Sequence, residues 1–249
     1  PVSLDATGIY MDVHSNAGTT WWPWGNVNGV FAPNRFELQT LGRKIAYYNG
    51  LTPEQSNAGG AIGGATDDFT YGTLGVAAFT IEMDGSSFWP SCTSYENTLV
   101  QPTLDGFFMA SKLARAPYRW AAGPEIINVL ATPAQTSLGG TVTITARAED
   151  ARFNNTVGTE PSQTVTSVAI YAMPPWQAGA TALAQFQPSD GAFNSTTENI
   201  TVDLPASSLS AGRQLLYLRA TDALGNAGPV AAVFVTVGQS DPLFQNGFE

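Results

Sequence analysis

The chain has 249 residues, of which 43% are hydrophobic and only 12% are charged, and it contains 25 glycines and 16 prolines. The charged fraction is about half the average for soluble domains, which favours a β-rich, turn-rich extracellular protein over a helical bundle or a disordered chain. The net charge of −10 disfavours non-specific binding to nucleic acid, so we expect no nucleic-acid partner.

Several features bear on the compartment of the protein. Cys92 is the only cysteine, so no disulfide can form within the chain, although exported bacterial proteins often have none. No apolar run approaches the roughly 20 residues of a membrane span, so we expect no transmembrane segment. The chain starts at Pro1 without a signal peptide, as expected of a processed chain or a fragment. We therefore predict a secreted, periplasmic or cell-surface protein.

The first elements along the chain are a strand and a helix. Residues 9–14 are apolar almost throughout, which predicts a buried strand in a parallel or mixed sheet covered on both faces. Residues 34–49 predict a helix, because apolar residues recur there at helical spacing. Asn34 stands three residues before Glu37, so we expect it to cap this helix.

A second strand and a second helix follow. Residues 76–82 form another apolar run that ends in Glu82 and predicts a second buried strand. Residues 98–116 predict a closing helix, with apolar residues along most of one face. Residues 1–122 are therefore predicted to form an α/β domain built on part of a mixed sheet.

The second half of the chain has a different sequence pattern. Residues 123–125 are predicted to be a linker, and residues 239–249 a mobile acidic and aromatic tail. Between them, residues 126–238 predict an all-β Greek-key sandwich, because short strands alternate with turns rich in Gly, Pro, Asn and Ser. The predicted strands are 126–131, 141–148, 165–171, 183–187, 198–204, 214–221 and 231–237.

The single histidine of the chain, His14, lies in the first predicted strand. A lone histidine in an apolar strand is most often a packed side chain that has found a hydrogen-bond partner. The alternative is a metal ligand, and a catalytic zinc ion needs three protein ligands. Because the chain has no second histidine, no spacing of two histidines can identify such a site. From the residues alone, both interpretations of His14 remain open.

Glu82 is the second candidate site residue. It ends an apolar strand, so we expect partial burial, which raises the pKa of a carboxyl group towards the range of a general base. The alternative is a carboxylate at the exit of a strand that faces solvent. Local sequence does not decide between the two.

Four segments in the first half form an ordered pattern. They are residues 11–25, with MDVHS followed by WPWG, residues 51–56 (LTPEQS), residues 66–72 (TDDFTYG) and residues 78–82 (AFTIE). Together they resemble the C-terminal part of the zinc carboxypeptidase family, and the resemblance covers about residues 1–116. It implies a partial, mixed-sheet carboxypeptidase-like fold. Residues 220–228 resemble a turn of bacterial immunoglobulin-like and fibronectin-like modules.

The resemblance implies a role for each matching residue. His14 would be a zinc ligand, and Glu82 the general base that takes a proton from water and passes it to the leaving amine. Ser15 would hold the substrate backbone. Asp67 would lie at the base of the specificity pocket and favour a C-terminal Lys or Arg. The neighbouring Asp68 leaves open which of the two carboxylates has that role.

The chain also departs from the family. The His-x-x-Glu zinc pair and the residues that clamp the substrate carboxylate are absent, and Gly60 stands where the family has a mobile tyrosine. We therefore expect a metallocarboxypeptidase acting on peptide or protein C-termini, with one Zn²⁺ per complete active site. The remaining ligands would come from an upstream half of the same precursor or from another chain. The alternative is a non-catalytic peptidase remnant with a β-sandwich binding or structural module.

Overall fold

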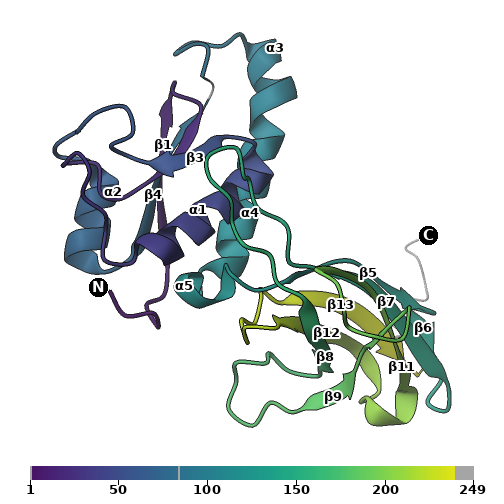
Figure 1. The fold of residues 1–249 in the computed structure, drawn as a ribbon. Helices are drawn as coiled ribbons and strands as arrows, with labels where there is room; N and C mark the ends of the chain where they lie inside the picture. Colours follow the sequence, from purple (N-terminus) through teal and green to yellow (C-terminus); the bar gives the residue numbers. More distant parts are fainter. Residues whose placement is uncertain (1, 84, 239–249) are drawn as a thin grey trace. The chain divides into compact units, whose positions relative to one another are not determined.

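The computed structural model describes residues 2–83 and 85–238 (Figure 1). The chain divides into two compact units. Unit 1 comprises Pro1–Ala122 and Arg152–Pro161, and unit 2 comprises Gly123–Ala151 and Ser162–Glu249. The predicted tail, residues 239–249, lies outside the described residues.

Unit 1 contains a four-stranded mixed sheet in the order β1-β4-β2-β3. The strands are β1 (Ile9–Ser15), β2 (Thr19–Trp22), β3 (Thr52–Gln55) and β4 (Ala77–Met83). β1 runs parallel to β4, whereas β2 is antiparallel to β4 and parallel to β3.

The two strands that the sequence predicts to be buried differ in their burial in the structure. β4 is interior in the sheet and buried from Ala77 to Ile81. β1 is an edge strand of the described sheet and is only half-buried, with Val13 42% exposed. The prediction of burial was therefore wrong for β1, because only one side of that strand has a neighbour among the described residues.

Two long helices complete the core of unit 1. They are α1 (Arg35–Asn49) and α4 (Val100–Leu113). Leu38, Leu41 and Ile45 recur at helical spacing on α1 and are fully buried in the same cluster as Phe79 of β4. Shorter helical segments are α2 (Thr66–Phe69), η1 (Thr70–Leu74), α3 (Cys92–Ser94), η2 (Tyr95–Leu99) and α5 (Pro117–Trp120). No helix in the described part of the chain is long and apolar enough to cross a membrane.

Asn34 stands at the N-cap position of α1, as predicted, but it does not cap the helix with its side chain. The Asn34 side chain makes no capping hydrogen bond to the helix. Its Oδ1 instead accepts hydrogen bonds from the Val2 N–H and the Tyr71 hydroxyl, each at 2.8 Å. The side chain thus joins the N-terminal segment to η1. These contacts link residues that are distant in the sequence, so local spacing does not reveal them.

Residues 152–161, which the sequence places inside the sandwich range, pack on α1 as part of unit 1. Arg43 Nη1 lies 2.7 Å from Glu160 Oε2, and the Thr40 hydroxyl donates to the other carboxylate oxygen of Glu160. Asn154 Nδ2 donates to the Leu51 carbonyl at 2.8 Å. The segment therefore contributes polar contacts to unit 1 that residues 1–122 do not supply.

We expect Glu160→Ala to lower the free energy of unfolding of unit 1 by about 2–3 kcal/mol, because it leaves a largely buried guanidinium without its carboxylate. The Arg43 and Glu160 side chains are each only 11% exposed. Urea unfolding followed by tryptophan fluorescence reports mainly on unit 1, since Trp176 is the only tryptophan outside it.

Asp5→Ala is the matched control for that experiment. It removes the Asp5–Arg119 ion pair of the same unit, whose side chains are 77% and 53% exposed. An exposed pair contributes less than about 1 kcal/mol. If the two variants lost the same small amount, the segment 152–161 would not stabilise unit 1 through this ion pair.

Unit 2 is a β-sandwich, as predicted. One sheet has the order β10-β11-β7-β5 and the other β6-β13-β12-β8-β9. The strands are β5 (Glu125–Thr132), β6 (Gln135–Thr136), β7 (Thr141–Glu149), β8 (Val165–Tyr171), β9 (Ala182–Gln185), β10 (Gln187–Pro188), β11 (Thr197–Pro205), β12 (Gly212–Asp222) and β13 (Ala231–Val237), with the short helix η3 (Ala206–Ser208). The two sheets share one apolar core, which includes Ile144, Ile170 and Leu218.

One predicted strand of unit 2 is divided. Residues 183–187 fall into β9 and β10, with the buried Phe186 between them. β9 pairs with β8 in one sheet, while β10 pairs with β11 in the other. The chain therefore changes sheets at Phe186, which its apolar local sequence does not signal.

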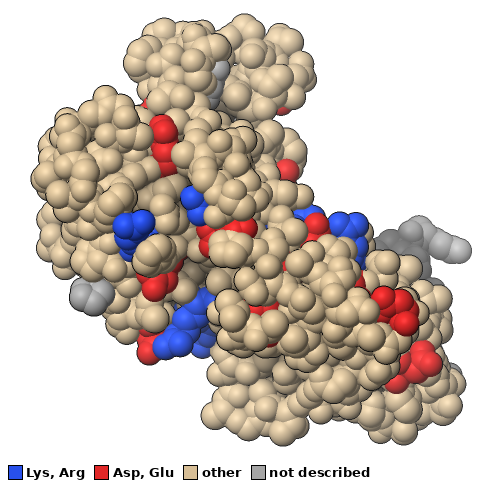
Figure 2. Space-filling view, in the orientation of Figure 1, with Lys and Arg blue, Asp and Glu red and all other residues tan. Residues whose placement is uncertain are grey.

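Charged side chains are sparse on the face shown in Figure 2, where the basic residues form small groups beside acidic ones. This distribution agrees with the totals of 10 basic and 20 acidic residues.

Candidate functional site

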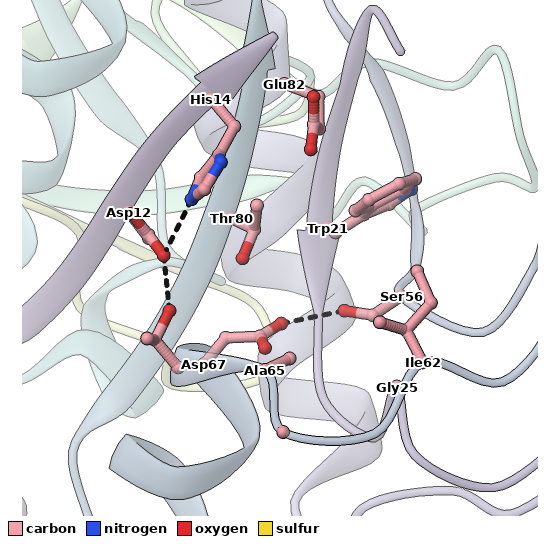
Figure 3. Close-up of a pocket in the computed structure, with 12 residues that line it drawn as sticks. Asp12, His14, Trp21, Gly25, Ser56, Ile62, Ala65, Asp67, Thr80 and Glu82 are labelled. Carbon is pink, nitrogen blue, oxygen red and sulfur yellow. Dashed lines mark hydrogen bonds and ion pairs between the residues drawn. The ribbon is translucent and has the colours of Figure 1, made fainter. Parts of the chain in front are cut away.

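A pocket of about 250 Å³ lies over one face of the sheet in unit 1 (Figure 3). Strands β1, β2 and β4, helix α2 and the adjoining loops supply its walls. The lining residues are Asp12, His14, Trp21, Gly25, Ser56, Ile62, Gly64, Ala65, Thr66, Asp67, Thr80 and Glu82. Three of the four residues that the sequence singles out, His14, Glu82 and Asp67, are among them.

The register of β1 and β4 brings His14 and Glu82 together. The two strands are parallel, with His14 opposite Glu82 and Asp12 opposite Thr80. Side chains two residues apart in a strand share a face of the sheet. All four side chains consequently line the same pocket (Figure 3).

A carboxylate holds the His14 imidazole. His14 Nε2 lies 3.0 Å from Asp12 Oδ2, and the Thr66 hydroxyl donates to the same oxygen. Burial acts to raise the pKa of Asp12, but the hydrogen bonds from Thr66 and His14 outweigh it and hold the pKa below its usual value. Asp12 and Thr66 were not predicted as site residues, although the two-residue spacing of Asp12 and His14 in a strand could have revealed Asp12.

Glu82 is half-buried, as its place at the end of β4 led us to expect. Its Oε2 accepts a hydrogen bond from the Ala17 N–H at 3.4 Å. The carboxylate lines the pocket on the strand next to His14 (Figure 3). It is therefore placed where it can take up a proton from a water molecule in the pocket.

The structure separates the roles of Asp67 and Asp68. Asp68 accepts hydrogen bonds from the backbone N–H groups of Gly25 and Asn26, at 2.8 and 2.9 Å, and so fixes a turn. Asp67 lines the pocket and accepts a hydrogen bond from the Ser56 hydroxyl at 2.8 Å. Burial raises the pKa of Asp67 above its usual value, although the hydrogen bonds from Ser56 and the Asp68 N–H act in the opposite direction.

Ser15 is not among the residues that line this pocket. It follows His14 in β1, so the alternation of the strand directs its side chain to the opposite face. The structure therefore does not bring Ser15 together with His14, Glu82 and Asp67.

A zinc ion would need more ligands than this pocket offers. Among residues 2–83 and 85–238, no three His, Cys, Asp or Glu side chains are grouped so that they could hold a metal ion. His14 has the chemistry of one ligand, because its imidazole lines the pocket and one ring nitrogen is held by a carboxylate. The described residues thus fit one ligand of a zinc site, whereas a catalytic zinc ion takes three from protein.

Comparison with known proteins assigns no family. No protein-family model matches the chain, and no curated protein matches it. Similar solved structures include the PKD domain of an M14-like peptidase from a Thermoplasmatales archaeon, at a TM-score of 0.28 and 15% identity, covering 47% of this chain and 97% of that one.

A second similar structure is an alkylpurine DNA glycosylase of Pseudomonas fluorescens, bound to DNA containing an abasic site analogue. Its TM-score is 0.28 and its identity 16%, and the match covers 54% of this chain and 38% of that one. At these TM-scores, neither likeness carries an argument about the function of this chain.

Proposed function

We propose that unit 1 is part of the catalytic domain of a zinc metallocarboxypeptidase that prefers peptides ending in Lys or Arg. The observation that carries the proposal is the convergence of His14, Glu82 and Asp67 on one pocket. These residues lie far apart in the sequence, and each is the residue to which the family resemblance gives a role. Chance placement of an imidazole, a general base and a buried carboxylate in one pocket is a weaker explanation.

Each side chain has a distinct task under this proposal. Asp67 binds the cationic side chain of the C-terminal residue, where partial desolvation strengthens the charge pair. Glu82 takes a proton from the attacking water and delivers it to the leaving amine. His14 supplies one ligand to zinc, which when bound acts as a Lewis acid.

The incomplete ligand set requires a partner. The described residues offer one zinc ligand where three are needed. We assign the other two to a polypeptide segment outside this chain, from the same precursor or from another subunit. The exposed edge of β1, which carries His14, is where such a segment would be nearest to the site.

The same incomplete set favours a second candidate function. If no segment completes the site, unit 1 is a non-catalytic peptidase remnant, and the sandwich of unit 2 serves binding or structure. Retention of both His14 and Glu82 in one pocket supports the enzyme instead.

Zinc content distinguishes the two functions. We expect about one zinc per chain in protein purified from its natural source, because the completing segment is then present. We expect almost no zinc in the recombinant 249-residue chain after dialysis, and no zinc in the natural protein carrying His14→Ala. Elemental analysis measures the zinc content of all three preparations.

Two results would contradict the proposal. If the natural protein contains no zinc and binds none when zinc is added, unit 1 is the non-catalytic peptidase remnant. Stoichiometric zinc in the recombinant chain that survives His14→Ala would mean that the metal lies elsewhere.

A further inference from the structure

Trp21 and Trp22 are neighbours in β2, and the alternation of the strand sends their side chains to opposite faces of the sheet. Trp22 is buried in the core, so close to Gly42 of α1 that a β-carbon on Gly42 would lie 2.6 Å from the indole. Trp21 instead lines the pocket (Figure 3). Local sequence does not distinguish the two tryptophans, and the family resemblance gives no role to Trp21.

The register of the sheet places Trp21 in a row of side chains that crosses all four strands. Asp12 lies opposite Thr80, and Thr80 lies opposite Trp21. Glu54 of β3 completes the row opposite Trp21. Side chains directly opposite one another on neighbouring strands share a face of the sheet. Asp12, Thr80 and Trp21 consequently all line the pocket.

Glu54 holds the indole of Trp21 in place. The indole Nε1–H donates to Glu54 Oε1 at 3.0 Å, so the polar edge of the ring already has its partner. The remaining surface of the ring is apolar, with the negative charge of the π-system on its two faces. An aromatic side chain of this kind attracts cations to its face, and tryptophan does so most strongly.

The charge of the pocket also suits a cation. The carboxylates of Asp12, Asp67 and Glu82 line it, and no Lys or Arg is among its described lining residues. Asp67 Oδ2 accepts from the Ser56 hydroxyl at 2.8 Å, and Oδ1 accepts from the Asp68 N–H at 2.9 Å. An ionised carboxylate has about four lone-pair sites, so Asp67 can accept further hydrogen bonds from a ligand.

A guanidinium group fits both the carboxylate and the indole. It is planar and weakly hydrated, it stacks on aromatic faces, and its N–H groups form a fork that matches a carboxylate. The fork can meet Asp67 while the plane lies on Trp21. The ammonium group of lysine is compact and strongly hydrated, so it gains the charge pair but less from the indole.

We propose that Trp21 is a specificity-determining residue that selects a guanidinium over an ammonium group, so that a C-terminal arginine is preferred to a C-terminal lysine. The preference among peptides rests on the proposed function, whereas the binding of a guanidinium by the pocket does not. The cavity, at about 250 Å³, admits a single amino-acid side chain.

The experiment uses the zinc-free 249-residue chain and two probes, n-propylguanidinium and n-butylammonium, which correspond to the side chains of arginine and lysine. Titration at constant ionic strength, followed by ¹H–¹⁵N NMR of the indole N–H groups, gives both dissociation constants. The chain has six tryptophans, and the signal of Trp21 is the one lost in Trp21→Phe. We expect the guanidinium to shift this signal and to bind about 3- to 30-fold more tightly than the ammonium.

Trp21→Leu should remove most of the preference for the guanidinium while both probes still bind, because Asp67 remains. Trp21→Phe should keep most of the preference, since it retains an aromatic face without the N–H. Trp89→Leu is the matched control: Trp89 is 91% exposed and outside the pocket, so its replacement should leave the ratio of the two dissociation constants unchanged. A purely structural role of Trp21 would lower the stability of its variants in urea without changing this ratio.

Equal affinity for the two probes, or no binding of the guanidinium, would overturn the proposal, as would a folded Trp21→Leu chain that keeps the full preference. If Trp21→Leu does not fold, the wild-type ratio and the indole signal decide, and a Trp21 signal that the guanidinium leaves unmoved overturns the proposal. The outcome is independent of the zinc measurement: guanidinium binding together with zinc-free natural protein would leave this pocket a guanidinium site and remove the proposed peptidase.

Discussion

Under the proposed function, replacing Glu82 with glutamine is expected to lower kcat for peptide hydrolysis by about 100- to 10,000-fold, the range typical of losing a general acid–base group. Glutamine has nearly the same shape and can still accept a hydrogen bond from the Ala17 N–H, which Glu82 accepts at 3.4 Å. It cannot take up a proton. Hydrolysis of a peptide ending in arginine, measured on protein from the natural source, gives kcat directly.

Glu96→Gln is the matched control for this prediction. Glu96 is an exposed residue of η2, outside the pocket, and its replacement removes the same charge. We expect unchanged kcat, and unchanged unfolding of both variants in urea. Activity that survives in the Glu82→Gln enzyme would exclude Glu82 as the general base.

Replacing Asp67 with asparagine is expected to lower kcat/KM for peptides ending in arginine by about 30- to 150-fold, the equivalent of about 2–3 kcal/mol for a desolvated charge pair. Peptides ending in phenylalanine should lose little, because they make no such pair. Asparagine fits the site: the Ser56 hydroxyl can accept from the new amide while it donates to the Trp22 carbonyl, which lies at 2.9 Å. The ratio of the two kcat/KM values is the measurement.

The pH dependence of the same ratio follows from burial. Burial raises the pKa of Asp67, so as the pH falls through this raised value the carboxylate becomes neutral and the preference for arginine is lost. Folding has the opposite dependence: a carboxyl with a raised pKa favours the folded state at low pH, and this contribution is lost as the pH rises through that value. Asp67→Asn should therefore not lower stability at neutral pH.

Asp68→Asn is the control that distinguishes a loss of substrate specificity from a loss of local structure. Asp68 fixes the turn at Gly25 and Asn26 and does not line the pocket. Its replacement should affect both classes of peptide equally. An equal loss on both classes for Asp67→Asn would instead contradict the assignment of Asp67 to the specificity pocket.

Local sequence predicted the elements whose signals repeat within a few residues. The apolar period of α1 and the alternation of the sandwich strands both appear in the structure, because burial of one face imposes that period. Asn34 occupies the predicted N-cap position, but its side chain does not make the capping hydrogen bond, because it bonds to Val2 and Tyr71 instead. The place of residues 152–161 in unit 1 was missed for the same reason: their partners lie more than 100 residues away in the sequence.

For the candidate site too, local sequence predicted some features and tertiary packing decided the others. The sequence by itself determined that His14 and Glu82 each lie in an apolar strand, and its resemblance to a known family led to the prediction that one of two adjacent aspartates belongs to the site. Only the tertiary structure decided that the parallel register of β1 and β4 brings the two side chains to one face, and that Asp67 rather than Asp68 lines the pocket. Strand periodicity fixes which side chains share a face within one strand, whereas register and burial depend on packing between segments that are distant in the chain.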